Sequence, residues 1–214
     1  ELGAKCGLFA PDAVTRAFLD AQSVANGAQP APAMDFETDA GDERCSPSNG
    51  YARSLTIALD TLEPQIACPH TVDNVHPIQT VAGRPVHHAY LGSCTNGRLE
   101  DLHIAAALLR TRTVAAHVQL HVYPASDRIA QAAERDGTMD TLRAAGAHIM
   151  GASCGPCFGA VGAILEAGQA CISSSNRNFR GRMGSEQADV YLASPATVAA
   201  SAIMGCLTDP RTLP

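Results

Sequence analysis

The chain has 214 residues, of which 46% are hydrophobic, and a formal net charge of −6 at pH 7. This length and apolar content are enough for one or two domains with a real core. The negative charge and the single lysine, Lys5, argue against a nucleic-acid-binding surface, and no apolar run reaches membrane-spanning length. The sequence shows no signal peptide, and its eight cysteines do not have the compact spacing of a disulfide framework. We therefore expect a reducing, cytoplasmic setting.

The first part of the chain predicts a helix followed by a long loop. Pro11 and Asp12 are typical of a first helical turn, and apolar residues then recur on one side as far as Leu19. Residues 26–50 are rich in Gly, Pro, Ala and Asp, which predicts a mobile, solvated loop. Residues 51–59 alternate between apolar and polar side chains, which predicts a strand.

From residue 84 onwards, short apolar runs alternate with helical patterns. Strands are predicted at residues 85–91, 117–123, 148–150, 170–173 and 190–193. Helices are predicted at residues 99–112, at 129–134 with Ser126 as the N-cap, at 139–144 and after Pro195. This alternation predicts an α/β fold whose mainly parallel sheet is flanked by helices in a three-layer α/β/α arrangement. We expect a partial domain over residues 1–83 and an α/β domain over residues 84–214.

Chemically active side chains follow three of the predicted strands. Cys94 comes after the first strand, Cys154 and Cys157 after the third, and the polar residues 176–182 after the fourth. Ligands of a parallel sheet gather beyond the carboxyl ends of its strands. We therefore expect these three segments to meet at one edge of the sheet.

The three cysteines can be interpreted in more than one way. A Cys-x-x-Cys pair such as Cys154 and Cys157 by itself fits a thioredoxin-like dithiol or half a zinc site. With Cys94 added, three thiolates can bind three irons of a cubane iron–sulfur cluster and leave the fourth iron open, as Lewis-acid catalysis requires. The amide and guanidinium groups of residues 176–182 have no use in a dithiol redox protein.

Three motifs of the chain resemble those of the aconitase family, which includes the isopropylmalate isomerases and homoaconitases. They are Gly-Ser-Cys-Thr-Asn at residues 92–96, Cys-Gly-Pro-Cys-Phe-Gly at residues 154–159 and Asn-Arg-Asn-Phe-x-Gly-Arg at residues 176–182. Their order and approximate spacing are those of the family. The resemblance covers nearly the whole chain but only the second half of the family's large subunit, and it implies an aconitase-like fold.

The resemblance implies a cofactor and a reaction. Cys94, Cys154 and Cys157 would bind a [4Fe-4S] cluster that has one iron not bound by cysteine. The reaction would be the reversible dehydration and rehydration of a hydroxy polycarboxylate, such as isopropylmalate, homoaconitate or a related acid. Such an enzyme is a hydro-lyase of the aconitase and isopropylmalate dehydratase type.

The resemblance also assigns roles to other residues. Asn176 would form a hydrogen bond near the cluster, and Arg177 and Arg182 would bind substrate carboxylates or hold catalytic groups. Glu1 begins a Glu-x-Gly-Ala element whose glutamate reaches the active site in the family, so it would contact the departing hydroxyl or water. The Thr-Asn pair after Cys94 is expected to shape the cluster loop.

The resemblance further implies partners. The chain has no counterpart of the first domain of the large subunit, nor of the swivelling fourth domain, which is a separate small subunit in two-subunit members. We therefore expect the chain to be inactive alone and to work with that N-terminal domain and the small subunit, without nucleic acid or membrane partners. Three alternatives stay open: a specialised secondary-pathway relative, a non-catalytic iron–sulfur or regulatory module, and a zinc site with His148 as the nearest histidine in sequence.

Overall fold

The computed structural model describes all residues except 1–4, 8, 10, 26–54, 160–161 and 163. The chain divides into two compact units, residues 2–60 and residues 61–214, and each is described by itself. The loop predicted at residues 26–50 lies outside the described residues, and so does Glu1.

The described part of the first unit contains the predicted helix, α1 (Ala13–Ala25). Asp12 precedes it, and its carboxylate accepts hydrogen bonds from the Thr15 backbone N–H at 2.8 Å and the Thr15 hydroxyl at 2.9 Å. These bonds satisfy a backbone donor of the first turn, and they lower the pKa of Asp12. The helix prediction is confirmed.

The strand predicted at residues 51–59 is wrong for its described part. Residues 55–58 have no regular structure, and the chain then forms a single 3₁₀ turn, η2 (Leu59–Thr61). Leu55 and Leu59 are 74% and 77% exposed. A strand needs a neighbour for its backbone groups, and among the described residues none pairs with this segment.

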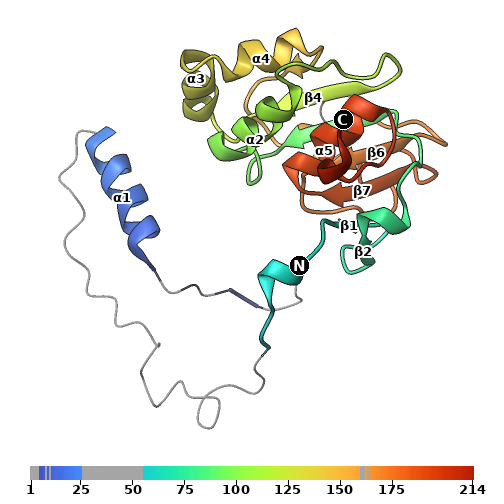
Figure 1. The fold of residues 1–214 in the computed structure, drawn as a ribbon, viewed down its shortest axis with the longest axis horizontal. Helices are drawn as coiled ribbons and strands as arrows, with labels where there is room; N and C mark the ends of the chain where they lie inside the picture. Colours follow the sequence, from blue (N-terminus) through green and yellow to red (C-terminus); the bar gives the residue numbers. More distant parts are fainter. Residues whose placement is uncertain (1–4, 8, 10, 26–54, 160–161, 163) are drawn as a thin grey trace. The chain divides into compact units, whose positions relative to one another are not determined.

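A seven-stranded sheet organises the second unit, in the order β2-β1-β7-β6-β3-β4-β5 (Figure 1). Its strands are β1 (Gln65–Ala67), β2 (Val75–Pro77), β3 (His88–Gly92), β4 (Gln119–Tyr123), β5 (His148–Ile149), β6 (Ala170–Ser173) and β7 (Asp189–Ala193). The last five are the predicted strands, and they run parallel. The sequence analysis missed β1 and β2, which pair antiparallel with each other, while β1 also pairs antiparallel with β7.

The four helices of this unit are those predicted: α2 (Leu99–Leu109), α3 (Asp127–Arg135), α4 (Thr138–Ala144) and α5 (Pro195–Met204). The hydroxyl of Ser126 accepts from the Ile129 N–H at 3.3 Å, which confirms the predicted cap of α3. At the start of α2, the Asp101 carboxylate accepts from the Arg98 N–H at 3.1 Å. Ser194 caps α5 in the same way as Ser126 caps α3.

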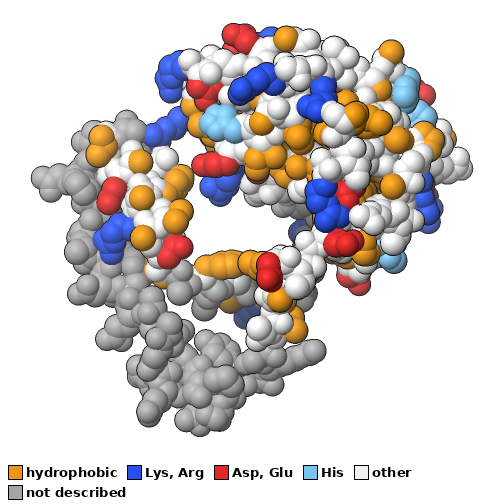
Figure 2. All heavy atoms as spheres, in the orientation of Figure 1, with side chains coloured by type: hydrophobic (Ala, Val, Ile, Leu, Met, Phe, Trp, Pro, Cys, Tyr) orange, Lys and Arg blue, Asp and Glu red, His pale blue; other side chains and the backbone are white. Residues whose placement is uncertain are grey.

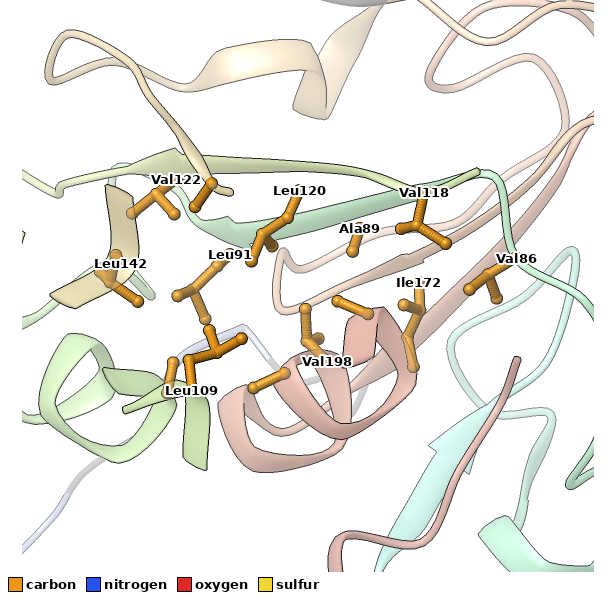
Figure 3. Close-up of a cluster of buried hydrophobic side chains, with 14 of the residues drawn as sticks. Val86, Ala89, Leu91, Leu109, Val118, Leu120, Val122, Leu142, Ile172 and Val198 are labelled. Carbon is orange, nitrogen blue, oxygen red and sulfur yellow. The ribbon is translucent and has the colours of Figure 1, made fainter. Parts of the chain in front are cut away.

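The larger core lies between one face of the sheet and helices α2, α4 and α5 (Figure 3). Strand side chains such as Leu91, Leu120 and Ile172 meet helix side chains such as Leu109 and Val198 in this core. The residues that alternate with them on the strands point to the other face, because successive side chains of a strand alternate. There the strand residues Tyr90, Tyr123, Cys171 and Val190 form a second cluster with Leu165, Met183 and Ala188 from the connecting segments.

The mainly parallel α/β fold flanked by helices is thus confirmed. The described helices of this unit contribute to the larger core, on one face of the sheet, so the third layer of the predicted α/β/α arrangement stays a prediction. Residues 65–77 belong to the same sheet as the rest of the second unit, and a domain boundary near residue 83 stays a prediction. Figure 2 shows basic and acidic side chains interspersed on the visible face of this unit. Among the described helices, none is both long enough and apolar enough to cross a bilayer.

Candidate functional site

Cys94 lies on the turn that follows β3. That strand ends at Gly92, whose φ of 92° favours glycine and where an added Cβ would lie 2.1 Å from the Tyr123 carbonyl oxygen. The turn can therefore run against β4 only because Gly92 has no side chain. The buried hydroxyl of Ser93 accepts from the backbone N–H groups of the two residues after Cys94, both at 3.3 Å. These bonds hold the turn with Cys94 exposed.

Cys154 and Cys157 lie on the loop that follows β5. The chain forms one 3₁₀ turn here, η4 (Gly155–Phe158), and the Cys157 N–H donates to the Cys154 carbonyl at 3.2 Å. Cys154 is exposed, and Cys157 is partly buried. The loop then passes against the third motif, because a Cβ on Gly159 would lie 3.0 Å from the Arg182 carbonyl oxygen.

The structure brings the cysteines of the two loops together. The thiols of Cys94 and Cys154 lie close enough to interact, and this interaction is the main reason why the pKa of Cys154 is raised. The negative charges of Cys94 and, to a lesser degree, of Cys157 act in the same direction. A thiol beside other thiols ionises less readily, because its thiolate would lie close to other negative charges. A bound cation offsets this repulsion, so the same thiols then become good ligands.

The three cysteines are compatible with a cubane cluster. In the part of the chain that the structure describes, no group of three or more His, Cys, Asp or Glu side chains is placed to hold one metal ion. A cubane cluster needs no such group, since each cysteine binds a different iron. His148, the nearest histidine in sequence for a zinc site, stacks on His121 with 5.2 Å between the ring centroids.

Asn176 lies against the Cys94 turn, as the sequence analysis expects. Its Oδ1 accepts a hydrogen bond from the Thr95 hydroxyl at 3.0 Å and another from the Asn96 Nδ2. The Asn96 amide also donates to the Ser174 carbonyl at 2.7 Å. These hydrogen bonds join the first motif to the third, and the role of the Thr-Asn pair in shaping a cluster loop stays a prediction.

The three arginines of the third motif differ in their surroundings. Arg182 is partly buried, and its Nε has no hydrogen-bond partner among the described residues. A buried donor without a partner costs about 1–3 kcal/mol, so an acceptor bound there would be stabilised. Arg177 is exposed, and Arg180 donates to the Glu186 carbonyl at 3.2 Å.

Asn178 anchors this loop, a role that the sequence analysis did not assign. Its Nδ2 is fully buried and donates to the carbonyl oxygens of Cys68 at 2.8 Å and Val190 at 3.3 Å. The loop that carries Asn176 and Arg182 is thereby tied to strand β7 and to the residue that follows β1. The sequence signal that could have pointed to Asn178 is its position in the third motif, between Arg177 and Arg182.

Two hollows of the surface differ in their relation to these residues. One of about 330 Å³ adjoins the site at the carboxyl ends of β3, β6 and β7, beside Asn96 and Ser174. A larger one of about 480 Å³ is lined by His70, Arg84 and Asp189 and contains none of the predicted site residues. We place the candidate site at the smaller hollow, at the carboxyl ends of the strands, because the cysteine loops and the arginine loop meet at that edge of the sheet.

Comparisons with known proteins point the same way. A family model described as the aconitase family (aconitate hydratase) matches residues 1–85 and 79–205. The chain is 45% identical to the homoaconitase large subunit of Thermus thermophilus over 213 residues, which cover all of the chain and 47% of that protein. It is 43% identical to the 3-isopropylmalate dehydratase large subunit of Oleidesulfovibrio alaskensis and to the probable methanogen homoaconitase large subunit of Methanosarcina mazei, covering 48% and 50% of them. The chain therefore spans about half the length of the curated relatives that it matches.

Proposed function

Because the chain belongs to the aconitase family, we propose that it is the cluster-binding part of a hydro-lyase large subunit. The proposed reaction is the reversible dehydration and rehydration of a hydroxy polycarboxylate. Relatives named homoaconitase and 3-isopropylmalate dehydratase support this class of substrate. The observation that carries the proposal is that Cys94 and Cys154 interact, with Cys157 nearby, beside the loop of Arg182, whose buried Nε–H has no partner among the described residues.

The three cysteines would hold a [4Fe-4S] cluster. The described cysteines, including these three, are free thiols, and sulfur is the soft ligand that iron–sulfur clusters require. When bound, the cluster would supply a Lewis-acidic iron without a cysteine ligand, which polarises the carbon–oxygen bond of a hydroxy acid. This chemistry needs a reducing compartment, and we propose the cytoplasm.

The remaining site residues would bind and orient the substrate. Arg182 would donate its Nε–H to a substrate carboxylate, which would satisfy a buried donor that has no partner among the described residues. Arg177, on the same loop, would bind a second carboxylate. Asn176, which the Cys94 turn holds by hydrogen bonds, would keep the two loops in register. Glu1, outside the described residues, would contact the hydroxyl or water that leaves.

The whole enzyme would contain further parts. The relatives are named large subunits, and the chain covers about half of each. We propose that the N-terminal domain of a large subunit and a small swivelling subunit complete the active site. The purified chain should then show no turnover, and turnover should appear when both parts are added. Measurable hydro-lyase activity of the chain alone would contradict this part of the proposal.

Anaerobic reconstitution with iron and sulfide tests the cluster directly. We expect a brown protein that gives a three-iron EPR signal after mild oxidation. Cys157→Ser should abolish this signal, whereas Cys206→Ser, which changes a partly buried cysteine outside the site, should keep it. A colourless protein that binds zinc through the same cysteines would refute the proposed function.

A further inference from the structure

Tyr123 lies between the two cysteine loops. It is the last residue of β4 and is only 1% exposed. The Cys94 turn follows the neighbouring strand β3 on one side of β4, and the loop of Cys154 and Cys157 follows β5 on the other. A residue at the end of β4 can therefore contact both loops.

The backbone of Tyr123 contacts the Cys94 turn. Its carbonyl oxygen would lie 2.1 Å from a Cβ added to Gly92 and 2.3 Å from a Cβ added to Gly97. Real Cβ atoms do not approach oxygen so closely, so there is no room for a side chain at either glycine. Both ends of the turn, Gly92 and Gly97, therefore pack directly against this carbonyl. The Cys94 turn is thus seated on the backbone of Tyr123.

The side chain of Tyr123 contacts the other loop. A Cβ added to Gly155, between the two cysteines, would lie 2.9 Å from three carbons of the ring, and one added to Gly162 would lie 2.5 Å from its hydroxyl. The hydroxyl is buried and has no hydrogen-bond partner among the described residues. The contact with the loop is therefore made by the volume of the ring and not by a hydrogen bond.

We propose that Tyr123 is a positioning residue that sets the spacing between Cys94 and the Cys154–Cys157 pair. The inference rests on the proposed function in one respect, that this spacing serves a cluster. A planar ring held between packed strands is rigid, and a misplacement of about 1 Å can change a proximity-dependent rate by as much as about 100-fold. The ring therefore acts as the spacer for two loops whose thiols must bind one cofactor.

A thiol-crosslinking experiment measures this spacing without iron. In the cluster-free chain, diamide oxidises two thiols to a disulfide: two S–H bonds break, one S–S bond forms, and the azo group takes up both protons and both electrons. Proteolysis and mass spectrometry then give the ratio of the Cys94–Cys154 disulfide to the Cys154–Cys157 disulfide. The second disulfide lies within one loop, so the ratio reports how the two loops are placed and not how stable the fold is.

We expect the wild type to form the Cys94–Cys154 disulfide preferentially, because the Cys154 thiol interacts more strongly with Cys94 than with Cys157. Tyr123→Leu, which removes the ring, should lower the ratio by about fivefold or more, and Tyr123→Phe, which keeps it, should stay within about twofold of wild type. Tyr191→Leu is the matched control, because Tyr191 is 4% exposed but belongs to the opposite core. An unchanged ratio in Tyr123→Leu, or an equal change in Tyr191→Leu, overturns the inference.

A second pair of variants keeps the test decisive if Tyr123→Leu does not fold. Gly155→Ala forces a methyl group onto the ring, whereas Gly168→Ala adds one where nothing lies within 4 Å, and both glycines have positive φ, 53° and 79°. Only Gly155→Ala should shift the disulfide ratio, and equal ratios for the two variants would overturn the inference. A wild type that shows the expected disulfides but assembles no cluster would instead refute the proposed function.

Discussion

Replacing Asn178 by alanine should destabilise the protein by an amount that follows from its contacts. Its buried Nδ2 donates at 2.8 Å to Cys68 and at 3.3 Å to Val190. A hydrogen bond contributes about 0.5–1.5 kcal/mol net, and a buried carbonyl left without its donor costs about 1–3 kcal/mol. The Asn178 Oδ1 has no partner among the described residues, so its removal offsets part of this cost. We expect Asn178→Ala to lower the free energy of unfolding by about 2–3 kcal/mol.

Urea unfolding followed by circular dichroism measures this loss. Gln187→Ala is the control, because Gln187 is exposed in the segment after the same loop, and its change should stay within about 0.5 kcal/mol. Asn178→Asp places a carboxylate oxygen against two carbonyl oxygens, and burial raises the pKa of the new carboxyl. Its deficit should therefore shrink as the pH falls from 8 to 4, because the protonated carboxyl can donate. A loss below about 0.5 kcal/mol for Asn178→Ala would show that the two hydrogen bonds do not hold the loop.

Three further predictions concern other parts of the structure. Gly92→Ala and Gly137→Ala both place alanine at a positive φ, of 92° and 80° respectively. A Cβ at Gly137 meets nothing within 4 Å, whereas a Cβ at Gly92 lies 2.1 Å from a carbonyl oxygen of β4. Thermal unfolding should give a loss of about 1 kcal/mol for Gly137→Ala and at least about 3 kcal/mol for Gly92→Ala, and equal losses would refute the close approach. The pKa of His121 is lowered from 6.5 to about 4, first by burial and then by the charges of two neighbouring histidines. As the pH drops from 6.5 towards 4, His121 binds a proton more readily in the unfolded chain than in the folded one, so the stability of the fold falls. His121→Gln should therefore flatten this part of the plot of stability against pH. An unchanged slope would show that other groups cause the pH dependence. Ser194→Ala removes the N-cap of α5 and should cost about 1 kcal/mol in the same unfolding assay, and no loss would show that the cap is dispensable.

Much of the fold could be predicted from residue 84 onwards. The five parallel strands and four helices there follow from periodicity and capping residues such as Ser126, which act within one turn or one strand. The candidate site followed from the same local reasoning, because Cys94, the Cys154 loop and residues 176–182 each come directly after a strand. In a parallel sheet, that placement alone directs them to one edge.

The failures have a common cause. Residues 51–59 alternate like a strand, yet the described part of this segment is exposed and pairs with no described strand of the sheet. The short strands β1 and β2 exist because β7 offers a partner. A strand satisfies its backbone groups only through another segment, so its own sequence does not decide whether it forms.

The sequence by itself determined the order of helices and strands from residue 84 onwards, the family motifs and the edge at which the three cysteines collect. Only the tertiary structure decided how the site is held together. Asn178 binds the Cys68 carbonyl across 110 positions of the chain, and Tyr123 separates two cysteine loops that flank it on neighbouring strands. Local patterns encode which conformation a segment prefers, whereas such contacts depend on which segments the folded chain brings within a few ångströms of one another.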